Sequence, residues 1–157
     1  MEDVAMRLRM YLLLLFVLLA ITSCSTAPEP QIPDAKQPPI PTSEPGSSTV
    51  VGQIIGTTTK APIKLTPVYL AAISWDQDHK EAAFILNISN SPAAQTDENG
   101  FFVMPKVQPA EYAIVVGDFY GRNEVLRESN GNAHIFVPKA GQVLDVGKIE
   151  MPPDVQK

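Results

Sequence analysis

The stretch Thr96-Asp97-Glu98-Asn99-Gly100-Phe101-Phe102-Val103-Met104 contains the clearest local fold information in the chain. Asn99 and Gly100 tolerate the positive φ that a tight turn requires, and the residues after them favour β-strands. The stretch therefore predicts a tight hairpin turn at Asn99-Gly100 that leads into a strand.

Further short apolar runs lie on both sides of this turn, separated by turn residues at intervals of about 8–12. They predict strands at 49–56, 67–73, 111–117, 133–137 and 143–151. The run 83–88 fits either a strand or a helical turn opened by Asp78. The 15 prolines of the 157-residue chain argue against a helical bundle, because proline breaks helix interiors.

The run Tyr112-Ala113-Ile114-Val115-Val116 shows how these strands would build a core. Side chains alternate along a strand, so Tyr112, Ile114 and Val116 share one face. The whole pattern predicts an all-β fold, a sandwich of about seven or eight strands over 49–153 followed by a short tail at 154–157.

The predicted body resembles a carboxypeptidase regulatory-like domain, a transthyretin-like or Ig-like β-sandwich. The resemblance is carried by the opening Val51-Gly52-Gln53-Ile54-Ile55, the turn at 96–101, the strand Pro109–Val116 and the closing run Ala140–Ile149. Ala110 stands where the family usually has glycine before the tyrosine strand. The resemblance implies a structural or binding module without catalytic residues, or an accessory to a separate peptidase.

The N-terminal residues 1–23 predict a targeting segment. Arg7 and Arg9 precede an apolar run at 11–21, which is shorter than the ~20 residues of a membrane-spanning helix. The following Ile21-Thr22-Ser23-Cys24 resembles the lipobox of bacterial lipoproteins. The resemblance implies cleavage between Ser23 and Cys24 and lipid attachment to the Cys24 thiol. The alternative is an ordinary signal peptide, or a buried structural cysteine.

The next segment, 24–48, carries the expected lipidated cysteine and then prolines throughout, with Ile32 and Ile40 as its large aliphatic residues. Such a segment buries too little apolar surface to fold alone, and proline favours extended conformations. We therefore expect a semi-rigid spacer between a cell membrane or outer membrane and an extracytoplasmic body.

The net charge and the residue content argue against several classes of function. A net charge of −5 argues against a nucleic-acid partner, which would require clustered Lys and Arg. No catalytic residues and no cofactor are predicted, because the two histidines, His79 and His134, fall in no hydrolase motif. Acidic residues at 76–79 and 97–99 are predicted to cap turns and not to bind metal.

Three aromatic residues offer a binding surface. Trp75 falls where the second strand is expected to end, and Phe119-Tyr120 follows the Tyr112 strand. A lone tryptophan in a sandwich belongs to the core more often than to a binding surface. The main hypothesis is a membrane-anchored structural or protein-interaction module in the cell envelope. The alternatives are a glycan-binding lipoprotein that uses Trp75, Phe119 and Tyr120, and a peptidase accessory subunit.

Overall fold

The computed structural model describes residues 36–156, and this part of the chain contains strands and one short 3-10 turn but no α-helix. The strands are β1 (Ser48–Gly56), β2 (Pro67–Trp75), β3 (Ala82–Ile85), β4 (Ala93–Gln95), β5 (Phe101–Val107), β6 (Tyr112–Gly117), β7 (Asn123–Val125), β8 (Ile135–Phe136) and β9 (Val143–Met151), and the 3-10 turn is η2 (Pro153–Gln156). The predicted all-β class is confirmed. The count exceeds the expected seven or eight because β4 and β8 have only 3 and 2 residues.

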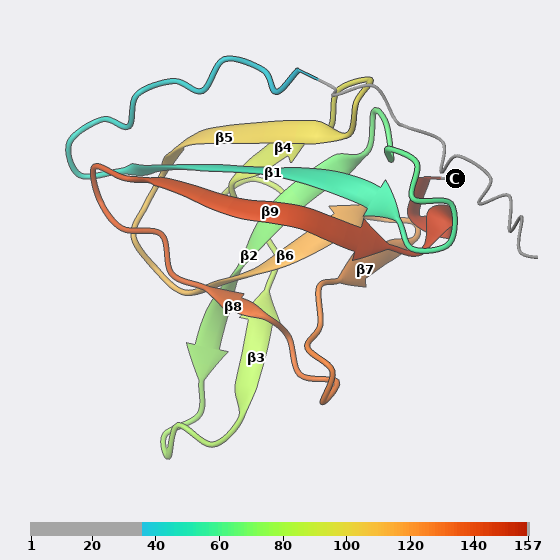
Figure 1. Ribbon diagram of the computed structural model, residues 1–157. Coiled ribbons are helices and arrows are strands. Elements are labelled where there is room, and N and C mark those ends of the chain that lie inside the picture. Colours follow the sequence, from blue (N-terminus) through green and yellow to red (C-terminus); the bar gives the residue numbers. More distant parts are fainter. Residues whose placement is uncertain (1–35, 157) are drawn as a thin grey trace, which may run out of the picture. The chain divides into compact units, whose positions relative to one another are not determined.

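The strands form two sheets that face each other (Figure 1). One sheet has three strands in the order β5-β1-β9, and β9 runs parallel to β1. The other has six strands, with the path β3-β2-β6-β7, while β4 adds to β2 and β8 adds to β6. The chain therefore forms a β-sandwich.

The core lies between these sheets and follows the alternation expected from the sequence. Tyr112, Ile114 and Val116 of β6 are buried together, as predicted. Val50 and Ile54 of β1 pack into the same cluster from the opposite sheet. Burial of these aliphatic and aromatic side chains is the main stabilising contribution, at about 25 cal/mol per Å² of apolar surface.

The opposite face of the six-stranded sheet is also partly covered. Ala71, Ala113 and Val115 are fully buried there, and the larger Tyr69 and Ile73 pack beside them. Small residues on β2 and β6 therefore form a second, shallow apolar cluster outside the main core.

The Asn99-Gly100 turn forms as predicted, but it does not close a hairpin. Asp97 Oδ1 accepts the N–H groups of Asn99 (2.8 Å) and Phe101 (2.9 Å), and Gly100 has φ 77°. The strand before the turn, β4, pairs with β2, whereas β5 pairs with β1. The hairpin interpretation was wrong because the turn carries the chain from one sheet to the other.

One further prediction is resolved by strand pairing. The ambiguous run 83–88 begins as strand β3, which pairs with β2 from Ala72 to Trp75. The chain also turns at Asn130-Gly131, with Gly131 at φ 87° and Glu128 N–H donating to Asn132 O.

The proline-rich segment is described only from residue 36, and its end is bound to the body. Ser43 Oγ donates to Gln142 O (2.7 Å) and accepts the Thr49 N–H (3.0 Å), which joins β1 to the start of β9. The predicted targeting segment and Cys24 lie outside the described residues. Within residues 36–156, no helix has the length and apolar character needed to span a membrane.

Candidate functional site

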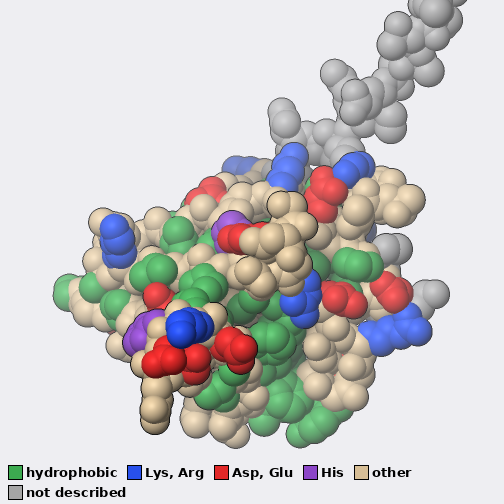
Figure 2. Space-filling view, turned by 90° about the horizontal axis from the view of Figure 1, so that it is seen from below, with side chains coloured by type: hydrophobic (Ala, Val, Ile, Leu, Met, Phe, Trp, Pro, Cys, Tyr) green, Lys and Arg blue, Asp and Glu red, His purple; other side chains and the backbone are tan. Residues whose placement is uncertain are grey.

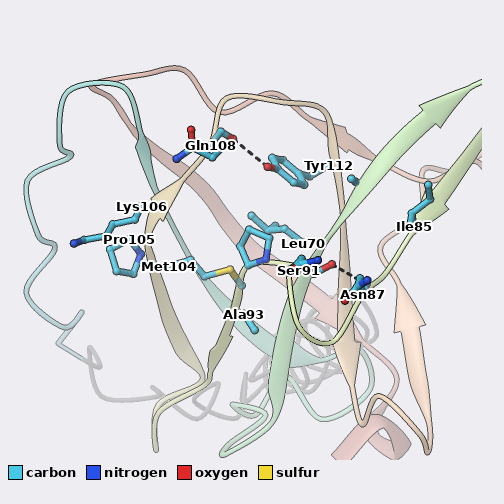
Figure 3. Close-up of a pocket in the computed structure, with 13 residues that line it drawn as sticks. Leu70, Ile85, Asn87, Ser91, Ala93, Met104, Pro105, Lys106, Gln108 and Tyr112 are labelled. Carbon is cyan, nitrogen blue, oxygen red and sulfur yellow. Dashed lines mark hydrogen bonds between the residues drawn. The ribbon is translucent and has the colours of Figure 1, made fainter.

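A groove opens at one edge of the sandwich, between the end of β5, the start of β6 and the β2–β3 pair (Figure 3). We call it the edge groove. Its volume is about 490 Å³, within the range of roughly 300–1,000 Å³ that is usual for ligand sites. Apolar lining residues include Leu70, Ala72, Ile85, Met104 and Tyr112, and polar lining residues are Asn87, Asn90, Ser91, Lys106 and Gln108.

Tyr112 is fixed in the wall of the edge groove by its hydroxyl group. The hydroxyl donates to the carbonyl oxygen of Gln108, four residues earlier, at 3.1 Å. This is the geometry of a tyrosine corner, which recurs in β-sandwich domains. Burial raises the pKa of the Tyr112 phenol above its ordinary value of 10.0, so the hydroxyl stays a donor up to at least about pH 10.

The loop between β3 and β4 forms the other side of the edge groove. The backbone N–H of Asn87 donates to Ser91 Oγ (2.9 Å), and Asn87 Oδ1 accepts the N–H of Ser89 (2.9 Å). The side-chain amides of Asn90 and Gln108 have no hydrogen-bond partner among the described residues. Both amides are exposed and can donate to and accept from a ligand.

Lys106 belongs to the groove lining at a bulge in β5, and Figure 3 shows its side chain directed away from Leu70 and Tyr112. The β1–β5 register shifts between Ser48 and Val50, and Lys106 adopts φ 61°, a conformation rare for residues other than glycine. Its ammonium lies 3.1 Å from the Glu44 carboxylate. Lys106 was not predicted as a site residue, although Pro105 inside a strand is typical of a bulge or a sheet edge.

Trp75 is the last residue of β2, as predicted, and 37% of its surface is exposed, so it does not belong to the core. The indole N–H donates to Glu111 Oε2 at 2.5 Å. Its ring stacks on the His79 imidazole, with centroids 6.0 Å apart and planes inclined by 17°. Figure 2 shows hydrophobic side chains across the middle of the face seen from below, with acidic and basic side chains around them and one mixed group of acidic, basic and histidine side chains at the lower left.

Phe119 and Tyr120 lie at the other end of the same sheet. Tyr69 near the start of β2 is opposite Val115 near the end of β6, and the Phe119 ring meets Tyr69 edge-on at 6.2 Å. Tyr120 is 85% exposed. The strand rise of about 3.3 Å per residue puts these rings roughly 20 Å from Trp75. The structure therefore does not bring the three predicted aromatic residues into one site.

The loop after β6 has an electrostatic effect on this second aromatic group. Asp118 Oδ1 accepts the N–H groups of Tyr120 (2.8 Å) and Gly121 (2.7 Å), which fixes the turn. Burial, with a smaller contribution from the Asp118 carboxylate, raises the pKa of Tyr69. Neutral tyrosine is thus favoured under the Phe119 ring.

The two histidines occupy different loops. His79 stacks on Trp75 in the β2–β3 turn, whereas the His134 ring lies 4.5 Å from the Phe136 ring, between β7 and β8. Across residues 36–156 no three acidic, histidine or cysteine residues are grouped so that they could hold a metal ion. Asp97 caps its turn, as the sequence predicted.

Comparison with known proteins gives similarity to solved structures only. No family model matches the chain, and no curated protein matches it. A 9R-lipoxygenase from Cyanothece PCC8801 is 17% identical, with a TM-score of 0.41 over 75% of this chain and 18% of the lipoxygenase. The major pilin subunit of Bacillus cereus is 15% identical, with a TM-score of 0.39 over 68% of this chain and 30% of the pilin.

A third solved structure is a Pseudomonas aeruginosa protein provisionally assigned as carbohydrate binding. It is 14% identical, with a TM-score of 0.43 over 74% of this chain and 100% of that protein. At these identities and scores, none of the three likenesses indicates an activity for this chain.

Proposed function

We propose that the chain is a lipid-anchored extracytoplasmic lipoprotein whose carboxypeptidase regulatory-like body is a non-catalytic interaction module of the cell envelope. The lipobox-like Ile21-Thr22-Ser23-Cys24 supports the anchor, since a thiolate at this position can accept the lipid. The edge groove is the observation that supports an interaction function for the β-sandwich. It is large enough for a ligand and combines an apolar floor with free amide groups.

The chemistry of the edge groove favours an uncharged ligand that is partly polar. Ile85 and Ala72, which are exposed in the groove lining, would bury apolar groups of a ligand. Asn90 and Gln108 can each pair with a backbone amide of an extended peptide, because a side-chain amide both donates and accepts. Lys106 is the charged residue in the lining, and Glu44 neutralises it.

A photo-crosslinking residue at position 108 tests this site in cells that make the full chain. We expect a protein adduct from position 108 and none from a matched control at position 150, an exposed residue of β9 remote from the groove lining. A second control, Ile85→Asp, places a charge in the groove and should reduce the adduct at least fivefold. Equal adducts at both positions, or none at position 108, would remove the edge groove from the proposal.

A glycan-binding function is the second candidate, and the exposure of Trp75 favours it. An indole beside the Glu111 carboxylate offers a stacking surface and a hydrogen-bond acceptor for a sugar. A glycan array with the wild type, Trp75→Ala and Tyr120→Ala tests it. Binding that is lost only in Trp75→Ala supports this candidate, whereas no binding by the wild type rejects it.

A further inference from the structure

The chain contains two Asn-Gly pairs, Asn99-Gly100 and Asn130-Gly131. Asparagine before glycine is prone to lose its side-chain amide, because a following residue without Cβ lets its backbone nitrogen approach the asparagine Cγ. Both pairs form turns in which the glycine has a positive φ, 77° at Gly100 and 87° at Gly131. The surroundings of the two pairs differ, and this difference separates a protected asparagine from a reactive one.

The Asn99-Gly100 pair is held by strand β1. Gly100 is buried, and its carbonyl oxygen accepts the Ile54 N–H at 2.8 Å. The Asn99 carbonyl oxygen accepts Gln53 Nε2, also at 2.8 Å. The Gly100 nitrogen can reach the Asn99 Cγ only if the peptide plane between the two residues turns, which would break these bonds. Reaction at Asn99 therefore requires local unfolding.

The Asn130-Gly131 pair lies in the loop between β7 and β8, which projects from the sandwich in Figure 1. Both residues are exposed, and no atom lies within 4 Å of a Cβ added at Gly131. An isolated bridge between Arg127 and Ala133 closes the loop. The Gly131 N–H donates to the Glu128 carbonyl oxygen at 2.9 Å within the same loop, so its nitrogen can be freed without moving a strand.

The side-chain amide of Asn130 is held in a position that favours attack on its Cγ. Its Oδ1 accepts the Asn132 N–H at 2.8 Å, and a donor there stabilises the negative charge that develops on this oxygen during attack. Its Nδ2 donates to Glu128 Oε2 at 3.1 Å, where the carboxylate can accept and return a proton. Within residues 36–156 the side-chain amide of Asn99 makes neither contact.

We propose that Asn130 is a self-modification site, where the folded turn converts asparagine to aspartate or isoaspartate with assistance from Glu128 and Asn132. The Gly131 nitrogen bonds to the Asn130 Cγ, the Cγ–Nδ2 bond breaks, and the Gly131 proton leaves with Nδ2 as ammonia. One water then opens the resulting succinimide. Cleavage of its Cγ–N bond gives aspartate, and cleavage of its bond between the main-chain carbonyl carbon and nitrogen gives isoaspartate. Water is the only co-reactant, and nothing is oxidised or reduced.

The modification would loosen this loop. The new carboxylate at position 130 would lie beside the Glu128 carboxylate, to which the amide had donated, and the two like charges repel each other. Isoaspartate also adds one carbon to the backbone, which disturbs the 2.8 Å bond from the Glu128 N–H to the Asn132 carbonyl oxygen. We therefore expect the loop between β7 and β8 to open as the protein ages.

Peptide mapping of the purified full chain, incubated in detergent at neutral pH, tests the site. Trypsin releases residues 128–139, which contain Asn130, and residues 81–106, which contain Asn99. We expect aspartate and isoaspartate to accumulate at least tenfold faster at position 130 than at position 99 of the same sample. In urea, which unfolds both turns, the two rates should agree within about threefold.

Two variants test the chemistry of the turn. Glu128→Gln keeps the side-chain length but removes the carboxylate, and it should slow the conversion of Asn130 at least threefold. The matched control Glu124→Gln, at an exposed residue of β7 outside the loop, should leave the rate unchanged. Gly131→Ala should slow the conversion at least tenfold, because the added Cβ hinders the approach of the nitrogen.

Several outcomes would overturn the proposal. They are an Asn130 that stays unmodified, equal conversion at positions 99 and 130 in the folded chain, and a preference for position 130 that persists in urea. An unchanged rate in Glu128→Gln would also overturn it, because the contacts of the folded turn would then not assist the reaction.

Discussion

Gly100 is the residue at which the chain crosses from one sheet to the other. Its φ of 77° favours glycine, and a Cβ added there would overlap the carbonyl oxygen of Ile54. We expect Gly100→Ala to lower the free energy of unfolding by about 2–3 kcal/mol in urea titrations. Gly131→Ala is the control, because Gly131 has φ 87° but no atom within 4 Å of the added Cβ.

The control should lose only about 1 kcal/mol, the cost of the left-handed conformation itself. If both substitutions lowered the free energy of unfolding equally, the close approach of residue 100 to the Ile54 carbonyl would not contribute to the loss in Gly100→Ala.

Tyr112 contributes a hydrogen bond and a pH dependence. Tyr112→Phe removes the bond to the Gln108 carbonyl and should lower the free energy of unfolding by about 1 kcal/mol at pH 7. Because burial raises the pKa of folded Tyr112 above 10.0, the unfolded chain loses this proton first as the pH rises. The contribution of the Tyr112 phenol to the free energy of unfolding is therefore fully present below about pH 10. It is lost as the pH rises through the pKa of the folded state.

Urea midpoints between pH 8 and pH 11 test this dependence. We expect the decline above about pH 10 to be shallower in Tyr112→Phe than in the wild type. Tyr69, whose pKa is also raised, would account for part of the remaining decline. The control Tyr120→Phe, at the exposed end of the loop, should follow the wild type, and a shallower decline in that control would contradict the assignment to Tyr112.

At the scale of the elements, the β2–β3 turn depends on Asp76. Its Oδ1 accepts the N–H groups of Lys80 (2.7 Å) and Glu81 (3.2 Å). We expect Asp76→Ala to speed hydrogen exchange of these two amides about fivefold, which corresponds to a loss of about 1 kcal/mol of local stability. Asp78→Ala is the control, since Asp78 is exposed and its carboxylate lies 3.6 Å from the Lys80 ammonium.

The buried amide of Ala113 in β6 should exchange at the same rate in both variants, because it belongs to the core sheet. Faster exchange at Ala113 in Asp76→Ala would show that the turn and the core open together.

The sequence predicted strands and turns correctly where residues close together in the chain determine the backbone conformation. The alternation in Tyr112–Val116, the turn at Gly100 and the strand that ends at Trp75 all follow from residue periodicity or backbone preference. It did not predict that β1 pairs in parallel with β9, or that the turn at Gly100 crosses between sheets. Strand partners are chosen by tertiary packing, which a single local pattern does not contain.

The candidate site was predictable to a smaller extent. Trp75 was located at a strand end, but its separation from Phe119 and Tyr120 follows from the antiparallel register of β2 and β6. The edge groove combines residues from several strands and loops, among them Ile85, Lys106 and Gln108. No local motif joins these residues, so the groove is seen only in the folded chain.

At the scale of the whole molecule, the proposed lipid would attach the protein to the membrane, and the β-sandwich would bind a partner. Each buried methylene of a lipid chain contributes about 0.8 kcal/mol, so two or three acyl chains on Cys24 would hold the protein at a bilayer. The acidic body gains no attraction from an anionic membrane. The edge groove of the body would then remain accessible to a binding partner.

Metabolic labelling with a palmitate analogue tests most directly the claim that this β-sandwich is held at a membrane through Cys24. The account predicts label in the wild-type chain and in Trp75→Ala, and none in Cys24→Ala. The unlabelled Cys24→Ala chain should also leave the membrane fraction. Label that persists in Cys24→Ala, or a wild-type chain that takes up no label, would contradict the account.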